Sequence, residues 1–177
     1  TSLSKQGLDA ARSAARELYG ANYVTDAPRT YDRKVKNSQE AHEAIRPAGE
    51  RFATPGQLAG ALDAEEFKLY ELIWARTVAS QMQDARGTSM KVTLQGDAAG
   101  EACEFAATGR TVPFPGWLRA YSDRQANETR LPQLTKGDEL ATNKVTADGH
   151  STNPPARYTE ASLVKKMEEL GIGRPST

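Results

Sequence analysis

Very little in this sequence could form a covalent cross-link or a metal cluster. Cys103 is the only cysteine among 177 residues, and there are two histidines. A single cysteine excludes an internal disulfide, and by itself it cannot build a zinc cluster or a redox pair. Because Cys103 alternates with Phe105 in a strand-like run, we expect it to be a small buried apolar residue rather than a nucleophile.

Long hydrophobic runs and an excess of one charge are also absent. No apolar stretch approaches the roughly 20 residues that span a bilayer, and the N-terminus lacks the basic-then-apolar layout of a signal peptide. We therefore expect a cytoplasmic protein with no membrane partner. The 23 basic and 23 acidic residues cancel, which argues against nucleic-acid binding over the whole surface. Any DNA contact must be local.

What the sequence does contain is typical of a globular protein: 38% of its residues are hydrophobic and 26% are charged. Its two ends look like interior positions of a longer chain. The first residue is Thr1 rather than Met, and residues 171–177 read as a helix stop followed by the start of another helix. We therefore expect an internal fragment.

Hydrophobic spacing predicts an α+β fold in which a small antiparallel sheet separates two helical segments. Helices are expected at residues 4–19, 38–45, 63–83 and 159–170, with N-caps at Asp63 and Thr159 for the last two. The period changes at Gly87 and predicts a hairpin with its turn at residues 96–100. A loop at residues 122–131 and a further strand pair within residues 134–145 follow, with turns at Lys136–Gly137 and Asp148–Gly149.

Residues 33–47 concentrate basic groups just before a predicted helix N-terminus, which is a phosphate-binding layout. Lys34 and Lys36 precede the helix, and His42 and Arg46 lie four residues apart on one face of it. An imidazole and a guanidinium so placed can reach the same phosphodiester. The alternative from spacing alone is a solvated charged face with His42 packed against its neighbours.

A second candidate lies at residues 171–177, where two glycines allow a close approach of the backbone and Pro175 suits the first turn of a helix. Arg174 and Thr177 offer hydrogen-bond donors to an anion there. The alternative is an ordinary helix–turn–helix connection. None of the six tyrosines has a base or electrophilic partner that the sequence would identify.

Taken together, three motifs resemble those of bacterial type IA DNA topoisomerases. At residues 78–80 and 86–88 the sequence is closer to that of actinobacterial members. Residues 37–47, NSQEAHEAIRP, resemble that family's signature around its active-site histidine. Residues 69–74, LYELIW, resemble the helix that leaves its cleavage domain. Residues 154–164, PPARYTEASLV, with 171–177, GIGRPST, resemble the segment that returns the chain to the base of its toroid.

The resemblance implies an ATP-independent enzyme that relaxes negative supercoils by transiently linking a tyrosine to one DNA strand. By this alignment the nucleophilic tyrosine and the magnesium-holding acidic domain lie outside the chain, so the fragment alone should be inactive. The implied supporting residues are His42, Arg174 and Thr177, and charge and placement add Lys34, Lys36 and Arg46 as phosphate contacts. The expected partner is DNA, mainly single-stranded, bound by a monomer associated with the nucleoid.

The same resemblance assigns residues 1–72 to the cleavage domain, 73–156 to a β-rich arch and 157–177 to the helical base domain. The arch carries no catalytic candidate, which fits a hinge. Two other readings stay open: a non-catalytic module that binds single-stranded DNA, and a purely structural or interaction domain.

Overall fold

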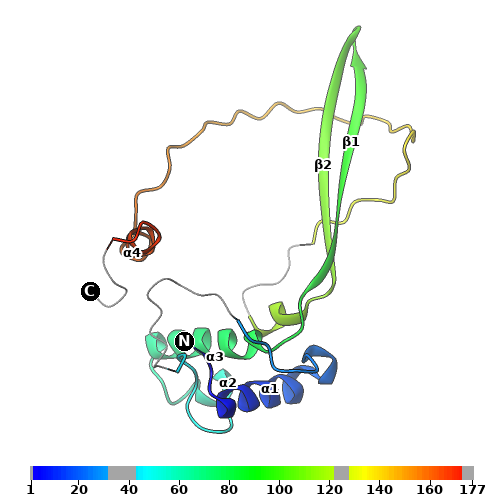
Figure 1. The fold of residues 1–177 in the computed structure, drawn as a ribbon. Coiled ribbons are helices and arrows are strands. Elements are labelled where there is room, and N and C mark those ends of the chain that lie inside the picture. Colours follow the sequence, from blue (N-terminus) through cyan, green and yellow to red (C-terminus); the bar gives the residue numbers. More distant parts are fainter. Residues whose placement is uncertain (1, 32–42, 122–127, 173–177) are drawn as a thin grey trace. The chain divides into compact units, whose positions relative to one another are not determined.

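The computed structural model describes residues 2–31, 43–121 and 128–172, and the chain divides into two compact units, residues 1–133 and 134–177. The first unit holds most of the secondary structure, and the second holds one helix (Figure 1). Helices and an antiparallel strand pair occur together, so the predicted α+β class is confirmed. No helix within the described ranges is long and apolar enough to cross a membrane.

The first helix, α1 (Lys5–Tyr19), forms where the periodicity predicts it. The Ser4 hydroxyl accepts a hydrogen bond from the Gly7 backbone N–H at 3.2 Å, which caps the start. Gly20 ends the helix at φ 99°, a conformation that favours glycine. Alanines on one face are almost fully buried and allow close packing against α3.

Helix α3 (Ala64–Ser80) is the centre of the core, after the short α2 (Pro55–Leu58). Its start is the predicted capping box: Asp63 accepts from the Glu66 backbone N–H, and the Glu66 carboxylate accepts from the Asp63 N–H. Trp74 and Val78 face inward, with 4% and 0% of their surface exposed. The core consists of Ala10, Ala11, Ala15, Val24, Phe52, Trp74, Ala75, Val78, Ala79, Met82 and Ala120.

Strands β1 (Arg86–Ala98) and β2 (Glu101–Phe114) form the predicted hairpin. Ala99 and Gly100, at φ 56° and 88°, close it in a two-residue turn. The register gives it one apolar face, on which Met90, Val92 and Leu94 lie opposite Gly109, Ala107 and Phe105. Cys103 is on this face but only half-buried, because nothing in the described residues covers the distal part of the hairpin; the prediction of a buried cysteine was wrong.

The helix predicted at residues 38–45 is not present in its described part. Residues 38–42 lie outside the described residues, and Glu43, Ala44 and Ile45 are not helical. Ser2 and Glu43 form a parallel β-bridge, in which the Ala44 N–H donates to the Ser2 carbonyl at 3.0 Å. This backbone pairing with the start of the chain replaces the helical hydrogen bonds that the local sequence favours.

The second unit begins as an extended chain and ends in α4 (Glu160–Glu169). The Lys136–Gly137 turn is present, but no strand forms within 134–145 and no turn at Asp148–Gly149, so those two predictions were wrong. Every residue from 135 to 163 is exposed, so no partner edge supplies the hydrogen bonds that a strand needs. Thr159 caps α4 as predicted, and Gly171 ends it at φ 71°.

Candidate nucleic-acid interface

The chain that leads into the basic run is held by the end of α3. Gln81 is 1% exposed, and its amide grips the backbone of Arg29: the Arg29 N–H donates to Oε1 at 3.0 Å, and Nε2 donates to the Arg29 carbonyl at 3.1 Å. The Tyr31 hydroxyl donates to the Ser80 carbonyl at 2.7 Å. Residues 29–31 therefore have a fixed position just before residue 32.

The Arg29 side chain strengthens this attachment. Its guanidinium donates to the Met82 carbonyl at 3.0 Å and to the Asp84 carboxylate at 2.7 Å, and it lies 5.9 Å from the centre of the Tyr31 ring. The hydrogen bond from Arg29 to Asp84 raises the pKa of the guanidinium. Arg29 is thus used internally and is not offered to a ligand.

The chain that leaves the basic run is held by the start of α1. The Glu43 carboxylate accepts from the Ser4 N–H at 2.9 Å and from Nε of Arg46 at 2.7 Å. Arg46 also donates to the carbonyls of Pro47 and Gly49, at 3.0 and 3.2 Å. A side chain on Gly7 would meet Arg46, since a Cβ built there lies 2.7 Å from its Cδ.

These contacts hold Glu43 ionised. The Arg46 guanidinium and the hydrogen bonds from Ser4 lower the pKa of the Glu43 carboxyl to about 2. The Arg46 side chain is 15% exposed and its N–H groups already have protein acceptors. In this conformation it anchors the chain beside residue 42, and a direct phosphate contact by Arg46 stays a prediction.

The other predicted site residues cannot be placed. Lys34, Lys36 and His42 fall in residues 32–42, and Arg174 and Thr177 fall in residues 173–177, all outside the described residues. The described part of the chain therefore supplies the two attachment points of the basic run, with Glu43 and Arg46 at the second, but not the side chains of Lys34, Lys36 and His42. Sequence reasoning identified the run and missed Gln81 and Arg29, which hold its first attachment point.

Arg12 is another residue that the sequence reasoning missed. It is 6% exposed, and its guanidinium donates to the carbonyls of Thr25, Asp26 and Ala27 at 2.7 to 3.1 Å. A signal for it exists, because Arg12 interrupts the apolar stripe of α1 between Ala11 and Ala15. It stabilises the loop that carries the chain toward residue 29.

A second group of cationic and aromatic side chains lies at the base of the hairpin, which we call the arginine–aromatic stack: Tyr23, Arg86, Phe114 and Arg119. The Arg86 guanidinium lies 5.6 Å from the centre of the Phe114 ring, across the strands. The ring centres of Phe114 and Tyr23 are 4.9 Å apart, and the Arg119 guanidinium lies 5.8 Å from the centre of the Tyr23 ring. The ring centre of Tyr19 lies 6.2 Å from that of Tyr23. Burial raises the pKa of Tyr19, although the positive charge of Arg119 acts to lower it.

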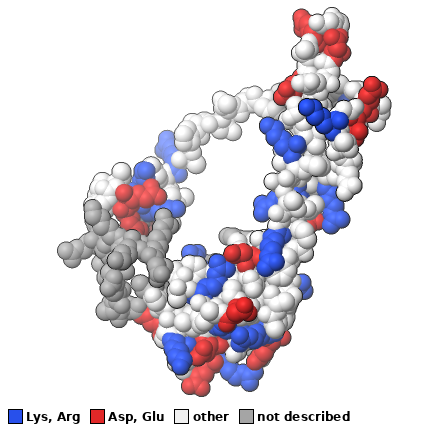
Figure 2. All heavy atoms as spheres, turned by 45° about the vertical axis from the view of Figure 1, so that its right-hand side comes forward, with Lys and Arg blue, Asp and Glu red and all other residues white. Residues whose placement is uncertain are grey.

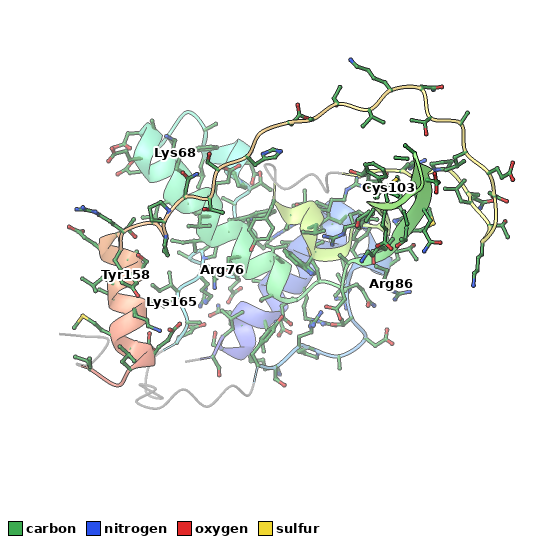
Figure 3. All side chains as sticks on the ribbon, turned by 90° about the horizontal axis from the view of Figure 1, so that it is seen from above. Lys68, Arg76, Arg86, Cys103, Tyr158 and Lys165 are labelled. Carbon is green, nitrogen blue, oxygen red and sulfur yellow. The ribbon has the colours of Figure 1, made fainter. Side chains whose placement is uncertain are left out.

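Charge is divided along the hairpin. Its acidic residues, Asp97, Glu101 and Glu104, belong to the distal half, and its basic residues, Arg86, Lys91 and Arg110, to the half nearer the helices. Figure 2 shows red side chains gathered at the tip and blue ones lower on the shaft. Figure 3 labels Arg86 at the hairpin, together with Lys68 and Arg76, which are exposed on α3.

No group of three or more His, Cys, Asp or Glu side chains is placed to hold a metal ion in residues 2–31, 43–121 and 128–172. The arginine–aromatic stack and the lower half of the hairpin do carry exposed basic side chains, which suit a polyanion.

Comparisons with known proteins agree with that chemistry. A family model described as DNA topoisomerase matches residues 1–177. DNA topoisomerase 1 of Mycobacterium leprae is 58% identical over 186 residues, and that of Streptomyces coelicolor is 54% identical over 186 residues. Both alignments cover 100% of this chain, but only 20% and 19% of those relatives, so the chain spans about a fifth of their length.

A solved structure is also similar. It is that of full-length topoisomerase I from Thermotoga maritima, which is 32% identical, with a TM-score of 0.68. The match covers 99% of this chain and 27% of that one. The arrangement of helices and hairpin is thus one that occurs within a larger protein of related sequence.

Proposed function

Because this chain belongs to the bacterial type IA DNA topoisomerase family, we propose that it is part of an enzyme that changes DNA topology by cutting and resealing one strand. In the proposed reaction a tyrosine elsewhere in the longer protein attacks a phosphodiester, another strand passes through the break, and the link is reversed without ATP. The observation that carries this proposal is the agreement of the family over all 177 residues, including the run that contains His42.

The proposed role of this chain is to position the phosphate that reacts. Attack by a phenolate builds negative charge on the non-bridging oxygens, and preorganised donors lower that barrier. We assign this role to His42, Arg174 and Thr177, with Lys34 and Lys36 as further phosphate contacts. The attachments of residues 29–31 and 43–46 support the assignment, because a group must be held closely in place to stabilise a transition state.

We further propose that residues 1–72 belong to the cleavage domain, 73–156 to an arch and 157–177 to the base of the toroid. Magnesium would be held by residues of the longer protein outside this chain, as the family resemblance implies. The partner would be DNA, mainly as a single strand, bound by a monomeric protein in the cytoplasm. The long hairpin supports an arch, because both of its strands rise well away from the helices at its base (Figure 1).

The test uses the longer protein with single changes in this chain. His42→Ala and Arg174→Ala should each lower the rate of strand cleavage by about 100-fold or more, which is typical when one transition-state donor is lost. Unfolding temperatures should stay close to that of the wild type. Arg51→Ala is the matched control, since Arg51 is 83% exposed and paired with Glu17. Wild-type cleavage by both variants would contradict the proposed roles.

A second assay tests the proposal that the nucleophile lies elsewhere. The 177-residue chain alone should not relax negatively supercoiled plasmid in the presence of magnesium, while the longer protein should. Relaxation by the chain alone would mean that one of its own side chains attacks DNA.

A further inference from the structure

The two arginines of the arginine–aromatic stack carry charge that the protein does not use. Arg86 and Arg119 are both exposed, and in the described part of the chain neither guanidinium has a carboxylate partner. The acidic residue two positions before Arg86 is Asp84, which Arg29 already binds at 2.7 Å. Arg119 donates one N–H to the Tyr23 hydroxyl at 3.5 Å, and stacking on an aromatic ring leaves the other N–H groups of a guanidinium free to donate to an anion.

The segments that carry the stack are joined to one another by backbone hydrogen bonds. The Gln83 N–H donates to the Tyr23 carbonyl at 2.7 Å, and the Trp117 N–H donates to the Gln83 carbonyl at 2.9 Å. Val24 and Met82 form a further antiparallel bridge. The start of β1 and the helical turns η1 (Ala21–Tyr23) and η2 (Gly116–Ala120) are therefore tied together. Because these backbones are already joined, a ligand at the stack does not have to bring the segments together.

The two guanidiniums belong to the two ends of a series of contacts. Arg86 lies 5.6 Å from the Phe114 ring, Phe114 lies 4.9 Å from Tyr23, and Arg119 lies 5.8 Å from the Tyr23 ring. Each guanidinium can therefore serve a different phosphate of one strand.

We propose that the arginine–aromatic stack is a binding surface for the sugar–phosphate backbone of a single DNA strand, with Arg86 and Arg119 each contacting one phosphate. This surface shares no residue with the basic run at residues 33–47, and the proposal rests on the proposed function. The aromatic rings act as supports for the guanidiniums; their faces are already occupied by each other and by the arginines. Recognition is therefore of the backbone and is independent of base sequence.

The test measures binding of a single-stranded oligonucleotide to the longer protein as salt is varied. Loss of one phosphate contact lowers the slope of log K against log salt by about 0.7 for a single strand, so R86Q/R119Q should lower it by about 1.4. If the wild type and the double variant bind equally at 1 M salt, this change in slope corresponds to about 25-fold weaker binding by the variant at 0.1 M salt. R86K/R119K keeps both charges and should recover most of the slope. Arg51→Gln removes an exposed arginine that is already paired with Glu17, and should change nothing.

The outcomes separate this inference from the proposed function. An unchanged slope in R86Q/R119Q, with a wild-type protein that binds and relaxes DNA, would overturn the inference alone. A wild-type protein that neither binds nor relaxes DNA would overturn the proposed function and the inference with it. If the double variant loses affinity for polyglutamate but not for DNA, the surface binds an acidic protein and the inference is wrong. Tyr23→Leu should reproduce part of the loss, because it removes both the ring beneath Arg119 and the hydroxyl to which Arg119 donates at 3.5 Å.

Discussion

Gly116 is the position where the base of the hairpin is least tolerant of change. It is buried at φ 50°, and a Cβ built there would lie 2.5 Å from the carbonyl carbon and oxygen of Asp84 and 2.6 Å from the nitrogen of Ala85. These are backbone atoms, so no side-chain rotation relieves the contact. They cannot retreat freely, because the neighbouring Trp117 N–H donates to the Gln83 carbonyl at 2.9 Å.

The expected cost of Gly116→Ala has two parts. The left-handed conformation costs an alanine roughly 1 to 2 kcal/mol, and forced crowding in a packed site adds about 1 to 3 kcal/mol. Gly49→Ala separates the two parts, because Gly49 has φ 84° but its nearest neighbour, the Arg51 carbonyl, is 3.7 Å away. We expect a loss of about 3 kcal/mol or more for Gly116→Ala and about 1 kcal/mol for Gly49→Ala.

The assay is chemical denaturation followed by tryptophan fluorescence. The sequence has two tryptophans, Trp74 in the core and Trp117 next to Gly116, and both lie in the first unit. The signal therefore reports unfolding of that unit alone. Equal free energies of unfolding for the Gly116→Ala and Gly49→Ala variants would refute the close approach of residues 84, 85 and 116.

Three further predictions concern buried or paired polar groups. Arg12→Met should lower the free energy of unfolding by about 3 kcal/mol, because three carbonyls lose a charged donor. The control is Arg16→Met at an exposed position of α1, which should lower it by under about 0.5 kcal/mol. Chemical denaturation of both variants measures the difference. The pKa of Glu43 is about 2, below its ordinary value of 4.5, so ionised Glu43 stabilises the folded protein fully above pH 4.5 and loses this effect as the pH falls through 2. The unfolding temperatures of the wild type and of Glu43→Gln should therefore converge between pH 4.5 and 2. A constant difference between them would contradict this. Gln81→Ala should cost about 2 kcal/mol and speed hydrogen exchange at the amide that Gln81 binds; unchanged exchange would show that this bond is not formed in solution.

The helices were the most predictable part of the fold, because their signals are local. The Asp63 and Glu66 capping box and the Thr159 cap are each encoded within four residues. Hairpin β1–β2 was predictable for the same reason. Apolar and polar residues alternate in the segments before and after a turn, and that turn contains a glycine with positive φ. The helix at residues 38–45 was wrong over 43–45, because the partner of Glu43 is Ser2, which no local pattern reveals.

The candidate site divides in the same way. The basic run is visible in the sequence as a cluster of charge, but the groups that attach it are far away: Gln81 holds Arg29 across 52 positions, and Glu43 binds Ser4 across 39. Side-chain to backbone bonds of this kind leave no periodic trace. A buried arginine in an apolar stripe, as at Arg12, is the one such signal that the sequence offers.

The failed strand prediction at residues 134–145 shows what the successful one depended on. Both segments alternate apolar and polar residues, and both contain a turn with a positive-φ glycine, Gly100 and Gly137. Only the first has two long flanking strands in register, whereas Leu140 and Val145 remain 52% and 68% exposed with no edge to pair with. Alternation therefore specifies which face a strand would bury, and a partner edge decides whether the strand forms. The arginine–aromatic stack obeys the same logic, since its four side chains come from η1, both strands and η2, and acquire a common surface only when the hairpin is docked on the helices.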